Sequence, residues 1–582
     1  MYYILALTLL AGLAEGVGLL MLLPLLQSMD LNAVGGSSNI PTDSISIYMQ
    51  SVLSALNLQD NIVAVILIIA FAFFVKGVLS FAAFGYSAYL VGQLQKDLKG
   101  QLFNFYIGMS YSYYSSRDTG HFINIINEQI TRALQSFRNL THLGTQVINA
   151  LVYISFAFVV AWKFGLMALI ASFFILYLFR WLNIHVRQLS RKTASENGHL
   201  AKLLIQTMHA FKYLSATGQT SSIRTNIISS IARLTDYQIR TGIAASLTHT
   251  VREPIAVILI MLIFLTQLVF LNQPVAPILV SILLFYRGIN SVVGIQTNWQ
   301  NTLEWIGSME LVHSEFEKQR QNQEVKGDYS VSLFTNSIQF SDVHFSYDSH
   351  FENVIKGVSL DIAASTSVGF VGESGSGKST LVDLITLMLR PQQGQVLIDG
   401  VAGQDINLES WRSQIGYVSQ ETVVFDDSIA NNICLWKGDP IKDPQLMDKI
   451  REASTQAHIA NFIDTLPEGY ETLVGDRGIR LSGGQRQRLF IARELFRKPN
   501  LLILDEATSS LDSVSERAIE ESINELKGSL TVVIIAHRLS TIRNVDCIYV
   551  FEHGQLMEAG TYDDLKATKD SHFSYLTNMQ SL

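Results

Sequence analysis

The chain has 582 residues, a net charge of −8 and 16% charged residues, whereas soluble globular proteins have roughly 25%. Together with a positive mean hydropathy of +0.25, this composition indicates a protein that lies partly in lipid. The charge balance excludes a bulk basic surface for nucleic acid. The two cysteines, Cys434 and Cys547, have no metal-like spacing, and we expect both to be reduced thiols of a cytosolic domain.

Long apolar runs dominate the sequence before about residue 300 and predict six transmembrane helices. The first run has no basic n-region and is too long for the h-region of a signal peptide, so it predicts a retained helix. The spans are 2–28, about 62–92, about 143–162, about 165–186 after a turn at 162–165, and the two halves of 254–286, divided at 272–274.

The loops between the spans predict the orientation of the chain. The loop 29–61 contains no Lys or Arg, whereas 93–142 and 187–252 are rich in both. The positive-inside rule therefore places both termini in the cytosol. The two inner loops are long and poor in Pro, so we expect helices that continue beyond the bilayer.

Three charged residues fall inside the predicted spans, and a fourth directly follows the last span: Glu15, Lys76 and Arg180, and then Arg287. At ~1.5 Å per residue they lie roughly 18–23 Å from the outer ends, just past mid-bilayer. Such residues are costly in lipid, so we expect Glu15 to pair with Lys76. The two arginines then either face a water-filled cavity that favours an anionic substrate, or reach the inner surface and loop carboxylates.

The second half of the chain follows a different pattern. Short strands alternate with helices after about residue 337, and the stretch before it is polar. This pattern predicts an α/β domain. We therefore divide the chain into an all-α membrane domain at 1–314, a linker at 315–336 and a nucleotide-binding domain at 337–582.

A phosphate loop follows the predicted strand 367–372. Its sequence fits G-x-x-x-x-G-K-[ST], with backbone amides to cradle phosphates, Lys378 to neutralise them and the Ser379 hydroxyl to bind Mg²⁺. A helix follows, so its N-terminus points at the anion. The candidate ATP-binding residues are Gly372, Glu373, Ser374, Gly375, Ser376, Gly377, Lys378, Ser379 and Thr380.

Two carboxylates end the apolar stretch Leu501-Leu-Ile-Leu. A buried strand of this kind carries its functional acids at the carboxyl end of the sheet. We expect Asp505 to hold Mg²⁺ and Glu506 to polarise the attacking water.

The segment Leu481-Ser482-Gly483-Gly484-Gln485 resembles the signature sequence of ATP-binding cassette (ABC) proteins. Other elements of that family follow the same order. Tyr347 matches the aromatic residue that stacks on adenine, Gln420 matches the glutamine that binds Mg²⁺ and couples the site to the membrane domain, and His537 matches the switch histidine. Ser509 to Asp512 matches the D-loop, and Val474 to Gly478 resembles the loop that contacts the inner loops in exporters. Within these motifs, the side chains of Arg477 and Gln487 can either make a functional contact or lie on the solvated surface.

The resemblance implies that one phosphate loop is half of a site. The signature of a second copy closes over the γ-phosphate, so two ATP molecules lie between two chains. The resemblance implies that the second copy binds ATP through Ser482, Gly483, Gly484, Gln485 and Asp512. The catalytic residues it implies are Glu506, His537 and Gln420, and the Mg²⁺ ligands are Ser379, Gln420 and Asp505.

The membrane half resembles type IV (exporter-type) ABC half-transporters. Tyr113 to Gly120 and Phe211 to Gly218 resemble the two coupling-helix regions of that class. The amphipathic elbow helix that usually precedes the first span is missing, so either the start is incomplete or this member dispenses with it. No protease domain precedes the first span, which argues against a peptide-cleaving exporter.

The resemblance thus implies ATP-driven transport by a dimer in the cell membrane, with the nucleotide-binding domain in the cytosol. Intact motifs favour a homodimer over a heterodimer. The expected substrate is amphipathic: a lipid, a lipid-linked glycan, a peptide or a hydrophobic small molecule. An importer on the exporter fold and an ATP-gated channel are the alternatives, and the six spans rule out a soluble cassette protein acting on DNA or ribosomes.

Overall fold

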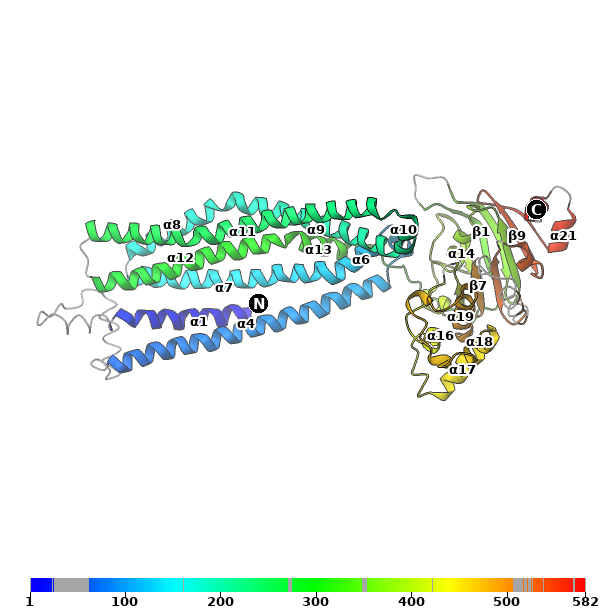
Figure 1. Ribbon diagram of the computed structural model, residues 1–582, viewed down its shortest axis with the longest axis horizontal. Helices are drawn as coiled ribbons and strands as arrows, with labels where there is room; N and C mark the ends of the chain where they lie inside the picture. Colours follow the sequence, from blue (N-terminus) through cyan, green and yellow to red (C-terminus); the bar gives the residue numbers. More distant parts are fainter. Residues whose placement is uncertain are drawn as a thin grey trace, which may run out of the picture. The chain divides into compact units, whose positions relative to one another are not determined.

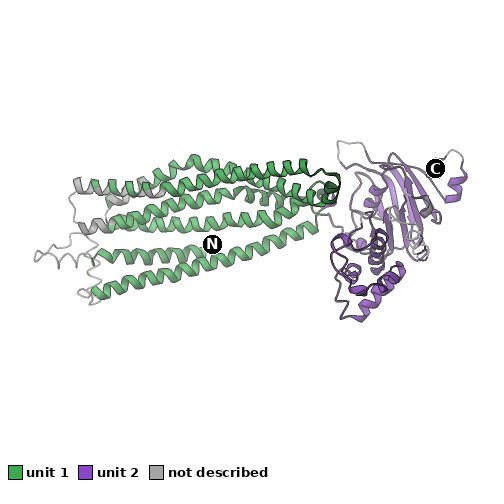
Figure 2. Ribbon diagram, viewed as in Figure 1, with its two compact units in different colours: residues 1–109, 113–323 green, residues 110–112, 324–582 purple. Residues whose placement is uncertain are grey.

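The computed structural model describes residues 2–23, 25, 62–160, 162–270, 275–347, 353–420, 422–505, 517, 521, 525, 527–536, 538–568 and 571–580. The predicted outer loop 29–61, the break at 272–274, Glu506, the D-loop with Asp512, and His537 lie outside these residues. Contacts divide the chain into two compact units (Figure 2). Unit 1 comprises Met1–Met109 and Tyr113–Gln323, and unit 2 comprises Ser110–Ser112 and Glu324–Leu582.

Unit 1 is helical, and its long helices run side by side (Figure 1). Helix α7 packs along α12, and α1 packs along α4. Among the described residues, α1, α4 and the helical run Thr119–Val160 are each long and apolar enough to cross a membrane. The long helices are α1 (Tyr2–Leu20), α4 (Ile62–Ile107), α7 (Ile130–Val160), α8 (Trp162–Leu178), α9 (Arg180–His209), α11 (Thr220–Phe270) and α12 (Val275–Glu304).

The predicted spans fall on these helices, with α8 and α9 sharing the fourth, and three details differ. Helix α1 ends at Leu20, before the predicted end of the first span at residue 28. Helix α8 begins at Trp162, so the residues predicted to form a turn are its first turn. The predicted fourth span crosses a helix break, because α8 ends at Leu178 and α9 begins at Arg180. The helices α4, α9 and α11 extend well beyond the predicted spans, which confirms that the inner loops are helical.

Short helices join the long ones. They are α5 (Tyr111–Ser115), α6 (Thr119–Asn124), the π-helix η1 (Ile125–Gln129), α10 (Phe211–Thr217) and α13 (Ile306–Gln321). Of the two stretches that resemble coupling-helix regions, Tyr113 to Gly120 covers the end of α5, the following turn and the start of α6, and Phe211 to Gly218 forms α10 and its C-cap. Helix α10 ends at Gly218, whose φ of 68° lies in the left-handed region that favours glycine. Helix α13 runs through the first residues of the predicted linker, and the domain boundaries remain predictions.

Unit 2 contains two sheets. The larger has the order β10-β9-β3-β8-β7-β6, in which β9, β3, β8, β7 and β6 are parallel and β10 is antiparallel to β9. The smaller is antiparallel, with the order β2-β1-β4-β5. The strands are β1 (Ser337–Phe345), β2 (Ile355–Ala363), β3 (Ser367–Gly372), β4 (Gln393–Ile398), β5 (Val401–Ala402), β6 (Ile415–Val418), β7 (Leu501–Asp505), β8 (Thr531–Ile535), β9 (Cys547–Glu552) and β10 (Gln555–Gly560).

Strands β7 and β8 of the larger sheet are buried along their whole length, as expected for parallel strands with both faces covered. Two hydrophobic clusters fill the unit, and Phe370 and Trp411 are among their fully buried members. The helices are α14 (Lys378–Ile385), α15 (Leu408–Arg412), α16 (Ile429–Cys434), α17 (Pro444–Gln456), α18 (Ala460–Asp464), α19 (Gly483–Phe496), α21 (Tyr562–Ala567) and α22 (His572–Gln580), with 3₁₀ turns η2 (Gly469–Glu471), η3 (Asp476–Gly478) and η4 (Leu539–Ile542).

Candidate functional site

The phosphate loop connects β3 to α14, as the sequence predicts. Two of its glycines are required by the backbone. Gly377 has φ 100°, and a Cβ at Gly372 would lie 2.2 Å from the carbonyl oxygen of Phe551. The loop can therefore turn tightly and present amides to an anion at the N-terminus of α14. Glu373, Ser374, Gly375 and Ser379 are exposed in this loop, whereas Ser376, Gly377, Lys378 and Thr380 are buried.

Lys378 lies inside the phosphate loop. Its Nζ donates to the carbonyl oxygens of Gly372 at 2.9 Å and Glu373 at 2.8 Å, and lies 3.3 Å from the Oγ of Ser376. The ammonium group is thus held at the centre of the curled backbone, where phosphate oxygens can replace these carbonyl oxygens.

Asp505 and Gln420 lie at the same edge of the larger sheet. Strands β6 and β7 are parallel, with Val418 opposite Leu504. The two side chains therefore follow the carboxyl ends of neighbouring strands. Asp505 is buried, and the hydroxyl of Tyr417 donates to its Oδ2 at 3.3 Å.

Asp383 is a member of this site that the sequence analysis missed. It lies on α14, three residues after Thr380. Burial, and then the charge of Asp505, raise the pKa of Asp383 from 3.8 to about 6. The only signal in the sequence is an acid on the helix that follows the phosphate loop. Two carboxylates that disfavour each other's ionisation create a place for a cation, and oxygen donors suit Mg²⁺.

Tyr347 lies beside the phosphate loop. Its hydroxyl is 3.1 Å from the Oγ1 of Thr380, and its ring makes an edge contact with Phe345 at 5.1 Å between centroids. The side chain remains 58% exposed. An aromatic face is thus available next to the phosphate site, as base stacking requires.

The signature segment begins α19. Ser482 is the N-cap, and it forms a capping box with Gln485. The backbone N–H of Gln485 donates to the Ser482 Oγ at 3.2 Å, and the backbone N–H of Ser482 donates to the Gln485 Oε1 at 2.8 Å. Ser482 and Gly483 are exposed and Gly484 is buried. Since the helix has 14 residues, its open N-terminus presents amides and a partial positive charge to an anion.

Two residues near the signature differ in exposure. Gln487 is 4% exposed, so the solvated-surface alternative is wrong for it. Arg477 is exposed and has φ 51°, a left-handed conformation in the loop before the signature.

Arg493 is a second residue that the sequence analysis missed. It lies on the signature helix and is 3% exposed. Its guanidinium donates to the carbonyl oxygens of Val423 and Asn432, each at 2.6 Å. Burial lowers the pKa of Arg493 to about 10, so it stays charged at neutral pH. Its hydrogen bonds connect the segment that follows Gln420 to the signature helix α19.

The charged residues of the membrane half are partly gathered in one cluster. Glu15 is 1% exposed, and its carboxylate pairs with Lys76 at 2.5 Å, as predicted, and accepts a hydrogen bond from Tyr153. Arg287 lies 3.6 Å from the same carboxylate, so Glu15 faces a second cation besides its predicted partner Lys76. Arg180 lies apart and exposed at the start of α9.

Comparison with known proteins agrees with this geometry. One family model, the ABC transporter transmembrane region, matches residues 4–292, and another, the ABC transporter, matches residues 355–509. The heterocyst differentiation ATP-binding protein HepA of Nostoc is 32% identical over 83% of this chain and 78% of that protein. An ATP-dependent lipid A-core flippase of Mannheimia succiniciproducens is 30% identical over 87% of this chain and 86% of that protein.

A solved structure has the same fold. It is a bacterial Atm1-family ABC exporter with ATP bound, which matches with a TM-score of 0.80 over 99% of this chain and 97% of that chain at 24% identity. The fold that joins a helical membrane region to an α/β region is thus shared over nearly the whole length of both chains. The chain therefore belongs to the ABC transporter family and is a membrane-embedded ATPase subunit that drives export or flipping of a substrate.

Proposed function

We propose that this transporter moves an amphipathic substrate that carries anionic groups. The observation that carries this proposal is the charge cluster of the membrane half. One carboxylate, Glu15, faces two cations, Lys76 and Arg287, which leaves one positive charge in the cluster of each chain. The Arg287 side chain is 43% exposed, so its guanidinium remains accessible to a second anion.

The position of these charges supports an anionic substrate over a cationic one. An excess cation inside a membrane span is costly and marks a water-filled path or a ligand. Arg180 adds a further exposed cation to each chain. The Mannheimia relative is named a lipid A-core flippase, which favours a lipid among the amphipathic classes.

The proposed working unit is a homodimer in the inner membrane of a bacterial cell, with both termini and unit 2 in the cytosol. Each chain carries one phosphate loop and one signature, and the residues of both motifs are intact. Two copies would therefore form two equal sites, each with Lys378 from one chain and Ser482 from the other.

The roles within each site are those that the resemblance to ABC proteins implies. Tyr347 stacks on adenine, and the loop from Gly372 to Thr380 holds the phosphates. The partner's signature, from Ser482 to Gln485, stabilises the γ-phosphate through amides and its helix N-terminus. Asp512 of the D-loop adds to the binding of ATP.

The catalytic roles fall on three further residues. Glu506 orients and polarises the attacking water, His537 contacts the γ-phosphate, and Gln420 reports the state of the site to the membrane helices. Mg²⁺ would be held by Ser379, Gln420 and Asp505 and would neutralise phosphate charge when bound. The buried Asp505 and the raised pKa of Asp383 fit such a cation.

Stimulated ATPase activity in proteoliposomes tests the substrate class. Phosphate-bearing lipids and cationic amphiphiles of matched chain length are compared in the wild type and in Arg287→Gln and Arg180→Gln. We expect anionic lipids to stimulate the wild type and to lose that effect in at least one variant, with basal ATPase unchanged. Arg240→Gln, an exposed change on α11 paired locally with Asp236, is the control. Stimulation by cationic amphiphiles alone, or an unchanged response in both variants, contradicts the proposal.

A further inference from the structure

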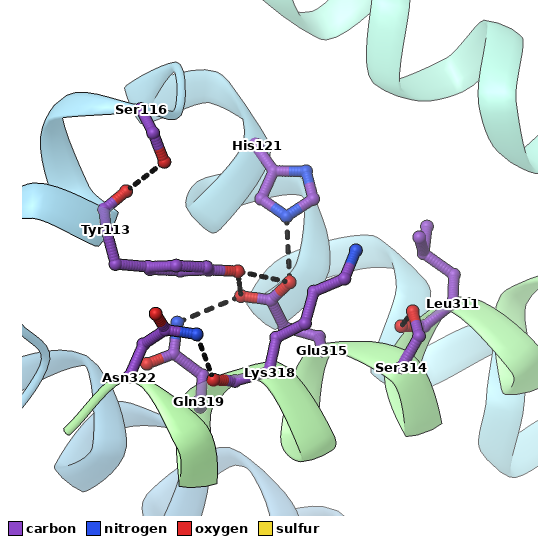
Figure 3. A network of polar contacts seen from close by, with 9 residues as sticks. All are labelled: Tyr113, Ser116, His121, Leu311, Ser314, Glu315, Lys318, Gln319 and Asn322. Atoms are coloured by element: carbon purple, nitrogen blue, oxygen red, sulfur yellow. Dashed lines mark hydrogen bonds and ion pairs between the residues drawn. The ribbon is translucent and has the colours of Figure 1, made fainter. Parts of the chain in front are cut away.

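A buried carboxylate lies outside both the ATP site and the charge cluster of the membrane half. Glu315 on α13 is 1% exposed. The hydroxyl of Tyr113 on α5 is 3.3 Å from both of its oxygens, and the Nε2 of His121 on α6 lies 2.9 Å from Oε2 (Figure 3). Gln319, one turn along α13, donates to Oε1 at 3.0 Å. We refer to Tyr113, His121 and Glu315 as the clamp.

The clamp holds an ionised carboxylate. Burial by itself raises the pKa of Glu315, but the hydrogen bonds from His121 and Gln319 outweigh burial and bring the pKa below its ordinary value. Burial, and then the charge of Glu315, raise the pKa of Tyr113, so its hydroxyl stays a donor. A further charged group near Tyr113 is Arg117, 5.7 Å from its ring centroid. Glu315 therefore needs its partners, because a buried charge without them is strongly unfavourable.

Aromatic packing surrounds the polar contacts. The ring of Phe122 lies 4.9 Å from that of Tyr106 on α4 and 6.3 Å from that of Tyr113. Leu102, Ile125 and Val312 form a buried cluster beside them. The end of α4, the α5–α6 turn and α13 thus form one packed body within unit 1.

The clamp lies where the chain passes from one unit to the other. Residues Ser110–Ser112 belong to unit 2, and the chain re-enters unit 1 at Tyr113. It leaves unit 1 for the last time after Gln323, soon after α13 ends. A β-bridge pairs Met109 with Gln323, and the Gln323 amide donates to the carbonyl of Phe105 at 3.1 Å. The segments that flank both crossings are therefore tied together.

We propose that the clamp is a coupling device: it makes α5 and α13 move as one body when the ATP-binding units close. Glu315 is a positioning residue that contacts neither ATP nor substrate. If α5 and α6 separated from α13, the buried Glu315 carboxylate would lose Tyr113 and His121, two of its three donors, so the three helices resist sliding past one another. A packed network with charged hydrogen bonds can carry such coupling between distant sites. The proposal rests on the dimeric, ATP-driven cycle of the proposed function.

Glu315→Gln tests the clamp in the full-length protein. It keeps the shape of the side chain and removes its charge. Distances between spin labels on the two chains of the dimer are measured without nucleotide and with ATP and vanadate, in a background that lacks Cys434 and Cys547. A label at Lys442→Cys, on the surface of unit 2, reports closure of the ATP-binding units. A label at Val63→Cys, at the end of α4 far from the clamp, reports the response of the membrane half.

We expect Glu315→Gln to keep the ATP-dependent change of the label distance at position 442. At position 63, the fraction of dimers whose label distance changes with ATP and vanadate should fall about fivefold or more, within the usual range of allosteric coupling. Tyr113→Phe, which deletes a single hydroxyl, should lower the same fraction. His121→Gln retains a donor and should keep more of the response than His121→Leu. Glu317→Gln, an exposed change on the same helix, is the matched control and should behave as the wild type.

The remaining outcomes overturn the proposal. Wild-type responses at both positions in Glu315→Gln and Tyr113→Phe would show that the clamp does not couple the units. Loss of both responses in Glu315→Gln would show that Glu315 only maintains the fold. A wild-type protein in which neither distance responds to ATP and vanadate would instead overturn the proposed function, and the coupling role with it.

Discussion

The guanidinium of Arg493 wraps around Asn432: its Nε donates to the backbone oxygen of Asn432 at 2.6 Å, and its Nη2 lies 2.9 Å from the side-chain Oδ1. The same side chain donates to Val423 and packs on the rings of Phe425 and Phe490, 5.3 and 5.1 Å from their centroids. A single buried cation therefore joins the signature helix, α16 and the segment after Gln420.

Arg493→Met should destabilise unit 2 without touching the nucleotide site directly. Methionine fills a similar volume but removes the donor to the backbone oxygen of the buried Asn432, so we expect a loss of about 3 kcal/mol in the free energy of unfolding. Chemical unfolding of the detergent-solubilised protein measures it. Arg451→Met, an exposed change on α17, should stay within about 0.5 kcal/mol of the wild type. Equal stability of the two variants would show that Arg493 is dispensable.

Glu506→Gln and Lys378→Ala should fail at different steps. Removing the group that polarises water should lower the hydrolysis rate by roughly 10²–10³-fold and leave ATP binding intact, so that closed dimers with trapped ATP accumulate. Removing Lys378 should instead weaken nucleotide binding, because its ammonium lies at the centre of the phosphate loop. Filter binding and ATPase rates separate the two cases. Wild-type turnover in Glu506→Gln would rule out its assignment as the group that activates water.

A mixed dimer should recover one working ATP site. If Lys378 of one chain and Ser482 of the other form each site, a Lys378→Ala chain paired with a Ser482→Ala chain places both changes in the same site. The opposite site keeps both native residues. Two-tag purification followed by ATPase assay should show more activity in the mixed dimer than in either pure mutant. Equal activity in all three dimers would contradict a shared site.

Asp383→Asn should stabilise the nucleotide-free protein at neutral pH. Because the folded pKa of Asp383 is raised from 3.8 to about 6, the folded state binds more protons than the unfolded state between these values. Its ionisation therefore costs stability progressively as the pH rises from about 4 to about 6, and the cost then stays constant. The asparagine variant should gain up to about 3 kcal/mol above pH 6 and little near pH 4.

Thermal unfolding between pH 4 and pH 8 checks this dependence. Asp563→Asn, an exposed change in the first turn of α21, is the control. The difference in stability between this variant and the wild type should not increase from pH 4 to pH 6. A gain for Asp383→Asn that is the same at every pH would show that the gain does not come from the ionisation of Asp383.

Local sequence predicted the parts of this protein whose chemistry is carried by consecutive residues. The phosphate loop needs glycines at fixed offsets and a lysine before a helix, and the structure places them between β3 and α14. The capping box from Ser482 to Gln485 is likewise contained in four residues. Long apolar runs similarly predict spans, because lipid forces each span to satisfy its own backbone hydrogen bonds.

Contacts between distant segments were decided only by the tertiary structure. Glu315 falls in a polar stretch that predicts a linker, yet it is buried, because Tyr113 and His121 supply donors from about 200 residues earlier in the chain. Arg287 lies 3.6 Å from Glu15 because α12 and α1 belong to the same helical unit. The sequence by itself determined the family, the ATP-site motifs and the succession of helices and strands, since each depends on residue type and local spacing. Which charges share a partner depends on how the helices pack, and only the folded chain decides that.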